Sequence, residues 1–231
     1  MTSEEKSIIN IFLDSSLSYV SGYPVGTCAG NTVVFSDDSV PLENKTTSIE
    51  QKISECTRCA LHKTKAHSVC GMGVENPLVL VIGEAPGEEE DKQGLPFVGP
   101  AGQLLDKMLA AINLSRLTNC YIANILKCRP PQNRDPLPDE IEACKSFLNA
   151  QIQHLKPKAI LLMGRIAAHS LLETQMPLNQ LHGNFCEYKK IPVMVTYHPN
   201  ALLRNVELKR PAWEDLKKFS AKLYEFSMES K

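Results

Sequence analysis

Four short runs of β-branched, leucine and other apolar residues alternate with helical patterns along the chain, and this alternation restricts the fold more than any other feature. The runs span residues 78–82, 121–126, 159–163 and 193–196. Each has the length of one buried strand, and each is separated from the next by a segment long enough for a helix. Strands that alternate with helices form a mostly parallel sheet covered on both faces. The sequence therefore predicts an α/β fold.

The predicted helices lie between and after these strands. Apolar residues recur at spacings of three and four in 102–112 and 141–155, and helical patterns also cover 164–172 and 212–226. Pro138 suits the first turn of the helix that includes 141–155. In a parallel sheet, ligands bind beyond the carboxyl ends of the strands. The stretch after Ile82, the segment 124–127 and the turn after Thr196 lie at such ends, so we expect them to converge on one crevice.

The connection after the first predicted strand is long and acidic. It runs from Gly83 to Gly102, reads GEAPGEEEDKQGLPFVGPAG and carries four consecutive carboxylates at 88–91. A plain connector needs only about two to six residues, and like charges this close repel one another. We interpret the stretch as a functional loop before the next helix. The alternative from these residues alone is a solvated acidic loop.

Length and composition favour one substantial domain. The chain has 231 residues, of which 43% are hydrophobic. A short amphipathic segment at 7–20, followed by a run rich in Gly, Ser, Thr and Asp, predicts an N-terminal extension at 1–48, partly helical or flexible, before a domain at 49–231. No apolar run is long enough for a membrane span, and the N-terminus does not resemble a secretory signal. We expect a soluble, cytoplasmic protein that does not associate with a membrane.

The charge is unevenly distributed. The formal net charge is −1, but residues 1–50 carry seven acidic and two basic side chains, which leaves 19 acidic and 23 basic side chains in 51–231. The predicted domain is therefore mildly basic. Such a balance permits contact with a phosphate backbone without requiring it, because local clusters matter more than the sum.

The eight cysteines do not suit a disulfide framework in a reducing compartment, so metal or cluster ligation is the better interpretation. Cys56 and Cys59 form a Cys-x-x-Cys pair, Cys128 follows a predicted strand and Cys144 lies in the next helix. Four such thiolates can enclose a tetrahedral metal or a cubane cluster. The alternative is that Cys144 is a small core residue on an apolar helix face. The remaining cysteines have no partner at ligand spacing and are interpreted as ordinary thiols: Cys28, Cys70, Cys120 and Cys186.

Taken together, these motifs resemble those of the family 4 uracil-DNA glycosylases, the iron-sulfur branch of the uracil-DNA glycosylase superfamily. The resemblance runs from about residue 55 to residue 219, and the motifs match in order and spacing. They read CTRCALHKTK, GEAPGEEEDKQGLPFVGPAGQLLD, YIANILKCRPPQNRDPLPDEIEAC, GRIAAHSLL, TYHPNALLRN and KRPAWEDLK. One departure from the family is Asn200, where a small residue is more frequent.

The resemblance implies a cofactor, an architecture and a set of site residues. The architecture is a three-layer α/β/α fold with a central four-stranded, mostly parallel sheet and an iron-sulfur cluster beside it. The implied ligands of a 4Fe-4S cluster are Cys56, Cys59, Cys128 and Cys144. The implied catalytic residues are Glu84 and His198, and the implied substrate-binding residues are Ala85, Glu90, Phe97, Asn124 and His198. Ala85 stands where some other branches of the superfamily carry a catalytic carboxylate.

The chemistry of uracil release suits these residue types. Breaking the bond between sugar and base leaves negative charge on the base, and a donor such as His198 can stabilise it at uracil O2. A carboxylate such as Glu84 favours the positively charged sugar and orients water. The amide of Asn124 offers one donor and one acceptor, which distinguishes the edge of uracil from that of cytosine. Phe97 supplies a stacking face for a base flipped out of the helix.

DNA binding requires contacts beyond the base. Leu202 and Leu203 are candidates for a wedge that fills the space left by a flipped base. Candidate phosphate contacts are Arg204, Lys209 and Arg210. Basic residues near the cysteines also suggest a DNA-facing surface that the cluster braces: Arg58, Lys127, Arg129 and Arg134. We therefore predict a monomeric glycosylase that acts on uracil in single- or double-stranded DNA, in base excision repair.

Other functions stay open at this point. A binding protein that traps uracil-DNA covalently is disfavoured, because the segment PPQNRDPLP has no histidine of the kind that a related trapping branch uses. An iron-sulfur redox protein is a further alternative, although no partner surface is evident. From sequence alone, the four cysteines also fit zinc.

Overall fold

The computed structural model describes residues 49–229 of the chain. The N-terminal extension, with the helix predicted at 7–20 and Cys28, lies outside the described residues. The described residues begin with α2 (Ile49–Ser54) and end with α9 (Lys209–Glu229). No helix among them combines the length and the apolar character that a membrane crossing requires.

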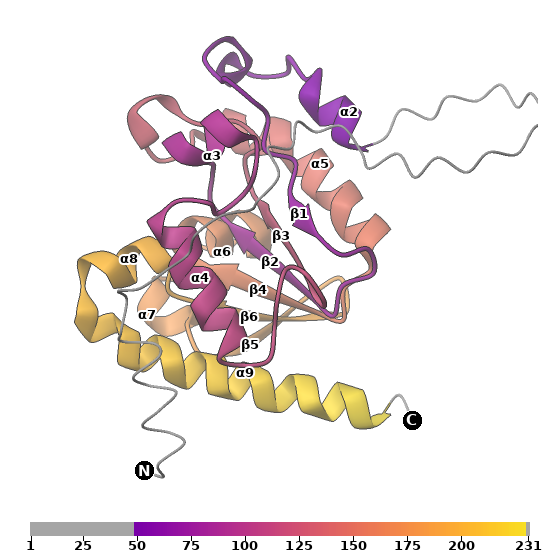
Figure 1. The fold of residues 1–231 in the computed structure, drawn as a ribbon, viewed down its shortest axis with the longest axis vertical. Coiled ribbons are helices and arrows are strands. Elements are labelled where there is room, and N and C mark those ends of the chain that lie inside the picture. Colours follow the sequence, from indigo (N-terminus) through magenta and orange to yellow (C-terminus); the bar gives the residue numbers. More distant parts are fainter. Residues whose placement is uncertain (1–48, 230–231) are drawn as a thin grey trace, which may run out of the picture.

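A six-stranded sheet forms the centre of the molecule (Figure 1). The predicted strands are found as β2 (Val79–Gly83), β3 (Cys120–Asn124), β4 (Ala159–Met163) and β6 (Ile191–Thr196), and these four run parallel to one another. The strand order is β1-β3-β2-β4-β6-β5. The α/β class with a mostly parallel sheet is therefore confirmed.

The expected count of four strands holds only for the parallel part of the sheet. Two antiparallel edge strands extend it, β1 (Met72–Gly73) beside β3 and β5 (Phe185–Tyr188) beside β6. The hairpin between β5 and β6 turns at Lys189 and Lys190, whose φ angles of 50° and 66° are both left-handed. A two-residue turn of this kind normally carries Asn or Gly, and the two lysines gave no such signal.

Helices cover both faces of the sheet, so the molecule has three layers. One face of the strands packs against α4 (Pro100–Ala110), α8 (Pro199–Arg204) and α9 in one hydrophobic core. The other face packs against α5 (Pro138–Leu155), α6 (Gly164–Leu172) and α7 (Leu178–Leu181) in a second core. Alternate residues of β2 point into different cores, Val79 and Val81 into the first and Leu80 and Ile82 into the second. This alternation explains why every residue of β2 is buried.

Shorter elements complete the chain. They are η1 (Ala60–Lys63) after α2, η2 (Pro131–Asn133) before α5 and η3 (Val206–Leu208) before α9. The helix α5 begins at Pro138, as its sequence predicted, because proline needs no hydrogen-bond acceptor at the first helical position. Its N-terminal carboxylate Glu140 accepts a hydrogen bond from the backbone of Leu137 at 2.8 Å.

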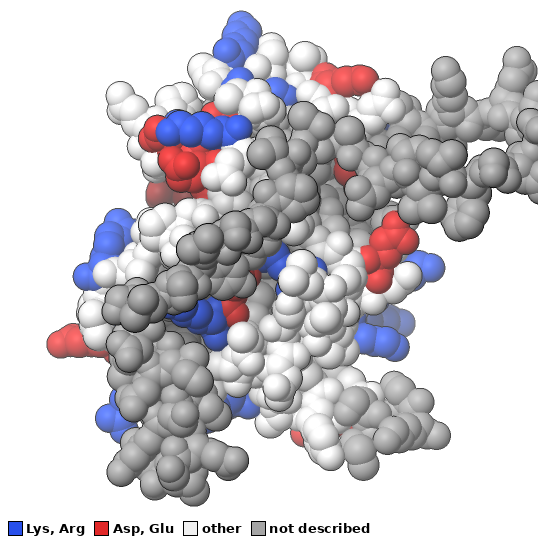
Figure 2. All heavy atoms as spheres, in the orientation of Figure 1, with Lys and Arg blue, Asp and Glu red and all other residues white. Residues whose placement is uncertain are grey.

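We expected the acidic stretch after β2 to be one continuous loop. Instead it contains the helix α3 (Glu88–Gln93). Its four carboxylates occupy the first turn, where the positive end of the helix dipole stabilises them. Asp91 is buried and accepts backbone hydrogen bonds from Ala66 and His67. Lys92 pairs with Glu88 and Glu89, and Figure 2 shows acidic and basic side chains lying together over this part of the molecule.

Candidate active site

One polar pocket opens at the carboxyl ends of the parallel strands. The residues that line it come from the end of β3 and from the segments after β2, β3 and β6, and they include Glu84, Asn124 and His198. Phe97, from the connection between α3 and α4, lines the same pocket. The three loops that we expected to meet at one crevice do so.

Asn124 is the last residue of β3 and is 2% exposed. Within residues 49–229, its Oδ1 is the one buried side-chain oxygen or nitrogen that has no hydrogen-bond partner. Such an atom costs about 1–3 kcal/mol when it stays unpaired. A side chain added at Gly83 would collide with Oδ1 and with the ring of Phe97, so only glycine fits at this position. The end of β2 therefore brings an unsatisfied acceptor and an aromatic ring together.

His198 lies two residues after β6 and caps the N-terminus of α8. Its Nδ1 accepts a hydrogen bond from the backbone N–H of Asn200 at 3.1 Å. Burial lowers the pKa of His198 to about 4, and the nearby Arg204 acts in the same direction. The ring is therefore neutral at pH 7 and carries its proton on Nε2, which makes Nε2 a donor. The side chain of Asn200 has no part in this hydrogen bond.

The backbone at the start of α6 leaves room for the side chain of His198. Gly164, directly after β4, has a φ of 88°, and a Cβ at that position would lie 2.9 Å from the Cβ of His198. Glycine is suited to this position because other residues rarely adopt the left-handed region. The rings of His198 and Phe97 are stacked with their centroids 5.6 Å apart.

Phe97 occupies a strained position. Its φ is 53°, in the left-handed region, which bulky residues rarely adopt. The buried guanidinium of Arg116 holds this conformation by donating to the carbonyl oxygens of Pro96 at 2.8 Å and of Phe97 at 3.1 Å. Arg116 also pairs with Asp106. The ring is 6% exposed, so Phe97 belongs both to the hydrophobic core and to the pocket wall.

Glu84 is the half-buried carboxylate directly after β2. Burial raises its pKa to about 7, and the like charge of Asp135 adds to this rise. Arg165 and Arg204 act in the opposite direction. Asp135 lies on the pocket wall and pairs with Arg165 at 2.8 Å. Glu84 is therefore shared between its protonated and ionised forms near neutral pH, as is frequent for acid-base groups in active sites.

Glu90 lines the pocket, but backbone groups occupy its carboxylate. Its oxygens accept hydrogen bonds from the N–H groups of Gly87, Val98 and Gly99, at 2.9–3.1 Å. These bonds join the start of α3 to the segment that follows Phe97. Ala85 also lines the pocket, and its small side chain leaves space beside Glu84.

Two neighbouring leucines at the rim of the pocket face in different directions. Leu203 is 44% exposed and lines the pocket, whereas Leu202 is fully buried in the core. Our suggestion that Leu202 acts as a wedge is therefore wrong, because the phase of α8 turns it toward the sheet. Arg204 and Arg210 are exposed and Lys209 is half-buried, and none of the three forms an ion pair with a described residue.

Of the four basic residues that we expected on a DNA-facing surface near the cysteines, burial rules out Lys127, whereas Arg58 is exposed and Arg129 and Arg134 are half-buried, so for these three the surface stays a prediction. Lys127 is 1% exposed, which excludes it from any surface. Arg58 lies over the ring of Phe147 and donates to Ser146, while Arg129 pairs with Glu88. Arg134 donates two hydrogen bonds to the buried carboxylate of Glu140. These side chains have structural partners within the protein.

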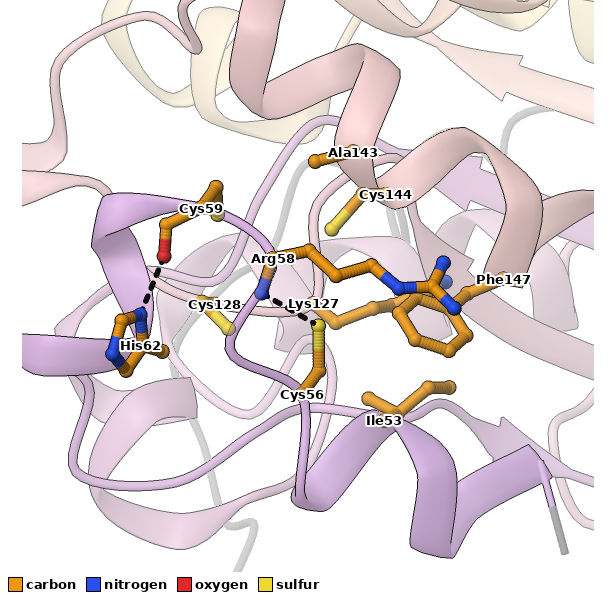
Figure 3. A pocket seen from close by; sticks show the side chains of 10 residues that line it. All are labelled: Ile53, Cys56, Arg58, Cys59, His62, Lys127, Cys128, Ala143, Cys144 and Phe147. Atoms are coloured by element: carbon orange, nitrogen blue, oxygen red, sulfur yellow. Dashed lines mark hydrogen bonds between the residues drawn. The ribbon is translucent and has the colours of Figure 1, made fainter.

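The four cysteines that we singled out line a second, small and mostly apolar pocket. Cys56 and Cys59 flank the turn between α2 and η1, Cys128 follows β3, and Cys144 lies on α5 (Figure 3). Their sulfurs point toward a common space in Figure 3, with Ile53 and Phe147 at its edge. No described cysteine forms a disulfide. Three segments distant in sequence thus bring four thiols together.

The thiols of this second pocket are suited to a cationic centre. Burial raises the pKa of Cys128 to about 12 and also raises that of Cys144, so both are neutral thiols unless a positive group binds them. Among residues 49–229, no set of three or more His, Cys, Asp or Glu side chains is arranged around one point where a single metal ion would fit. A cubane differs in that each thiolate binds a separate iron, so its ligands lie further apart.

Sequence reasoning missed several residues around the pocket. Arg116 lies after the end of α4 and supports Phe97. The charges of Asp135 and Arg165 act on Glu84, but the sequence analysis gave neither residue a role, although both lie within the quoted motifs. Lys127 was assigned to the surface, although its ammonium donates to the carbonyl oxygen of Asn124. Burial lowers the pKa of Lys127 to about 8, so the ammonium is the main form at pH 7. Long-range contacts decide these roles, and a single sequence carries little signal of them.

Comparisons with known proteins identify relatives of the chain. Residues 70–217 match the model of the family described as the uracil DNA glycosylase superfamily. The chain is 42% identical over 178 residues to a type-4 uracil-DNA glycosylase of Archaeoglobus fulgidus, which covers 74% of this chain and 89% of the relative. It is 40% identical over 176 residues to a protein of the same name from Thermotoga maritima, covering 74% and 90%. A third, from Sulfurisphaera tokodaii, is 38% identical over 178 residues, covering 74% and 81%.

Proposed function

The chain belongs to the uracil DNA glycosylase superfamily and, within it, to the type-4 uracil-DNA glycosylases, and we propose that it excises uracil in the pocket of Phe97, Asn124 and His198. The reaction is hydrolysis of the N-glycosidic bond of a uracil nucleotide flipped out of DNA. It leaves an abasic site and free uracil. A DNA substrate implies that the enzyme works inside the cell, in base excision repair.

The single observation that carries the proposal is the unpaired Oδ1 of Asn124. A buried acceptor that faces an open pocket is stabilised when a ligand donates to it, and uracil offers such a donor in its N3–H. The amide nitrogen of Asn124 then donates to O4. Cytosine has no proton on N3 and carries an amine at position 4, so it leaves both groups of Asn124 unpaired. Sites of this kind reject the mismatched base strongly.

His198 is the proposed electrophilic partner of the departing base. Because Nδ1 accepts from Asn200, the neutral ring donates only through Nε2, which we place on uracil O2. The negative charge that develops on the base then meets a donor that is already oriented. One such donor contributes about 3–4 kcal/mol to the stabilisation of a transition state.

Glu84 is proposed to act on the sugar side of the bond. As a carboxylate it stabilises the positive charge that develops on the sugar, and it orients the attacking water. The water adds to the anomeric carbon, its proton passes to solvent or to Glu84, and uracil leaves with the electron pair of the broken bond. The raised pKa of Glu84 suits a group that exchanges protons near pH 7.

The rim of the pocket supplies the proposed contacts with DNA. Leu203 enters the space that the flipped base leaves, which offsets part of the cost of unstacking. Arg204, Lys209 and Arg210 bind phosphates, because their charges are not neutralised by described residues. We place the enzyme on single- or double-stranded DNA as a monomer.

The second pocket is the proposed site of a 4Fe-4S cluster, with Cys56, Cys59, Cys128 and Cys144 as ligands. The donor set supports this assignment, since two buried and two half-buried thiols from three separate segments line one small pocket, and four thiolates are the ligands of such a cluster. When bound, the cluster supplies four iron–thiolate bonds that cross-link the segment of Cys56 and Cys59 to the end of β3 and to α5. Its proposed role is structural.

The experiment that tests the function uses oligonucleotides that contain one uracil. The full chain is expected to produce alkali-labile abasic sites in single and double strands. His198→Ala removes the donor to O2, so we expect kcat to fall about 100- to 1,000-fold. His154→Ala, on the exposed side of α5, is the matched control and is expected to keep full activity.

Two outcomes of this assay count against the proposal. Strands that stay intact after alkali treatment of the wild-type reaction contradict the excision of uracil. A protein–DNA adduct that survives a denaturing gel indicates a trapping protein instead. An unchanged kcat in His198→Ala contradicts the role of this side chain.

A further inference from the structure

A buried ammonium group connects the two pockets. The Nζ of Lys127 donates to the backbone carbonyl oxygen of Asn124 at 2.7 Å and to Oε1 of Gln151 at 2.6 Å. The same side chain lines the thiol pocket beside Cys128 and Cys144, as Figure 3 shows. Gln151 lies on α5, one helix with Cys144, and donates in turn to the carbonyl oxygen of Cys70 at 2.6 Å. The side chain of Lys127 therefore lines the candidate cluster site, and its ammonium donates to the backbone of the residue that is proposed to read uracil.

The charge of Lys127 has no acidic partner among residues 49–229. Its two described acceptors, a backbone carbonyl and an amide, are neutral. No described Asp or Glu forms an ion pair with it. A buried charge without a counter-charge costs several kcal/mol. The groups beside it that can become anionic are the thiols of Cys144 and Cys128 in the second pocket and that of Cys70 outside it.

We infer that Lys127 is a positioning residue that provides the counter-charge of the thiolate-bound cluster and fixes Asn124 for uracil recognition. Four thiolates around a 4Fe-4S cluster leave a net negative charge, which the ammonium compensates. The hydrogen bond to the carbonyl of Asn124 fixes the backbone at the end of β3, from which the reading amide projects. This inference rests on the proposed function, since it assigns a support to the residue that reads uracil.

Besides its structural role, the cluster would affect the reaction through its negative charge, which holds the ammonium of Lys127 beside Asn124. Without the cluster, the ammonium loses its counter-charge and is driven toward water. The carbonyl of Asn124 then loses its donor, and the side-chain amide is no longer held against Gly83 and Phe97. Residues that orient ligands from outside the first coordination sphere typically change metal affinity or activity by about 10- to 100-fold.

The test compares Lys127→Met with Lys145→Met in the full chain, purified with its iron. Lys145 lies on α5 and pairs with Glu173 at the surface, so this control removes a lysine charge without touching either pocket. We expect Lys127→Met to lose its absorbance at roughly 400 nm about 10- to 100-fold faster in the presence of a chelator. We also expect kcat/KM on uracil DNA to fall about 10- to 100-fold. Lys145→Met is expected to match the wild type in both.

A double mutant separates positioning from general damage. If Lys127 acts through Asn124, then Lys127→Met has no further effect on kcat/KM in an Asn124→Ala background. An effect of the same size in both backgrounds overturns this part of the inference. Lys127→Gln keeps a donor but removes the charge, and it serves if Lys127→Met does not fold. It is expected to lose its cluster quickly while it still favours uracil over cytosine.

The inference and the proposed function fail in different ways. A wild-type chain that excises no uracil refutes the function, whereas the rate of cluster loss still tests the counter-charge. If the wild type is active and the Lys127 variants retain the cluster and the kcat/KM of the wild type, the inference is refuted and the proposed function stands.

Discussion

The two pockets begin within five residues of each other at the end of β3, yet they are built in opposite ways. The pocket of Asn124 is open and polar, and it contains an unpaired buried oxygen and a phenylalanine with left-handed backbone. The pocket of Cys128 is small and apolar, with thiols surrounded by Ile53 and Phe147. Polar groups without a hydrogen-bond partner suit a ligand that binds and dissociates, because they are paired only while the ligand is bound. Thiols surrounded by packed side chains suit a group that stays.

This difference predicts opposite effects of mutation on activity and stability. In the open pocket, removal of a side chain should abolish activity and leave the fold intact. In the thiol pocket, it should first weaken the fold. Active sites commonly show this conflict between stability and function.

The largest contrast between activity and stability is expected for Asn124→Ala. Without the amide, the N3 and O4 positions of uracil lose their partners, so kcat/KM should fall at least about 100-fold. The thermal midpoint should stay the same or rise, because the substitution removes an unpaired buried oxygen. Oligonucleotide assays and thermal unfolding check the two halves. A clear loss of stability would show that Asn124 is a structural residue.

A smaller and opposite effect is expected for Cys144→Ala. This variant should lose its cluster absorbance and unfold at a temperature about 4–8 °C lower, which corresponds to roughly 2 kcal/mol in a protein of this size. Cys120→Ala is the matched control, because Cys120 is equally buried but belongs to the sheet and lies outside the thiol pocket. Equal losses in the two variants would indicate that Cys144 only fills space.

The pH dependence distinguishes Glu84 from His198. If the carboxylate form of Glu84 is required, kcat/KM rises about tenfold per pH unit below pH 7 and levels off above it. Protonation of His198 does not contribute to this limb, because its pKa is about 4. Glu84→Gln should abolish the limb. Asp135→Asn should move it to lower pH, since the charge of Asp135 raises the pKa of Glu84. A limb that stays in place in both variants belongs to another group.

The smallest effect is expected at the rim of the open pocket. Leu203→Ala should reduce activity about tenfold on double-stranded DNA and much less on single strands, because only a duplex has a stack to fill. Val206→Ala is the control, since Val206 is 62% exposed but does not line the pocket. Equal losses on both substrates would mean that Leu203 does not act as a wedge.

The sequence predicted the parallel strands and the residues at their ends, because both depend on local patterns. The apolar runs marked β2, β3, β4 and β6, and the polar residues directly after them marked the open pocket. The sequence did not predict α3, since EEEDKQ is too short to show a helical period. The helix is held in place by backbone N–H groups of other segments that donate to Glu90 and Asp91.

Residues that depend on long-range contacts were missed for the same physical reason. Lys127 and Arg116 look like surface charges in the sequence, and only their distant acceptors explain their burial. Leu202 and Leu203 are neighbours of identical type, so only the phase of α8 shows which one reaches the pocket.

The most direct test of the central claim is a crystal structure of the full chain with free uracil bound. We predict that N3 of uracil donates to Oδ1 of Asn124, that Nε2 of His198 donates to O2, and that the ring lies against Phe97. Uracil bound elsewhere, or bound here with Oδ1 of Asn124 still unpaired, would contradict the account.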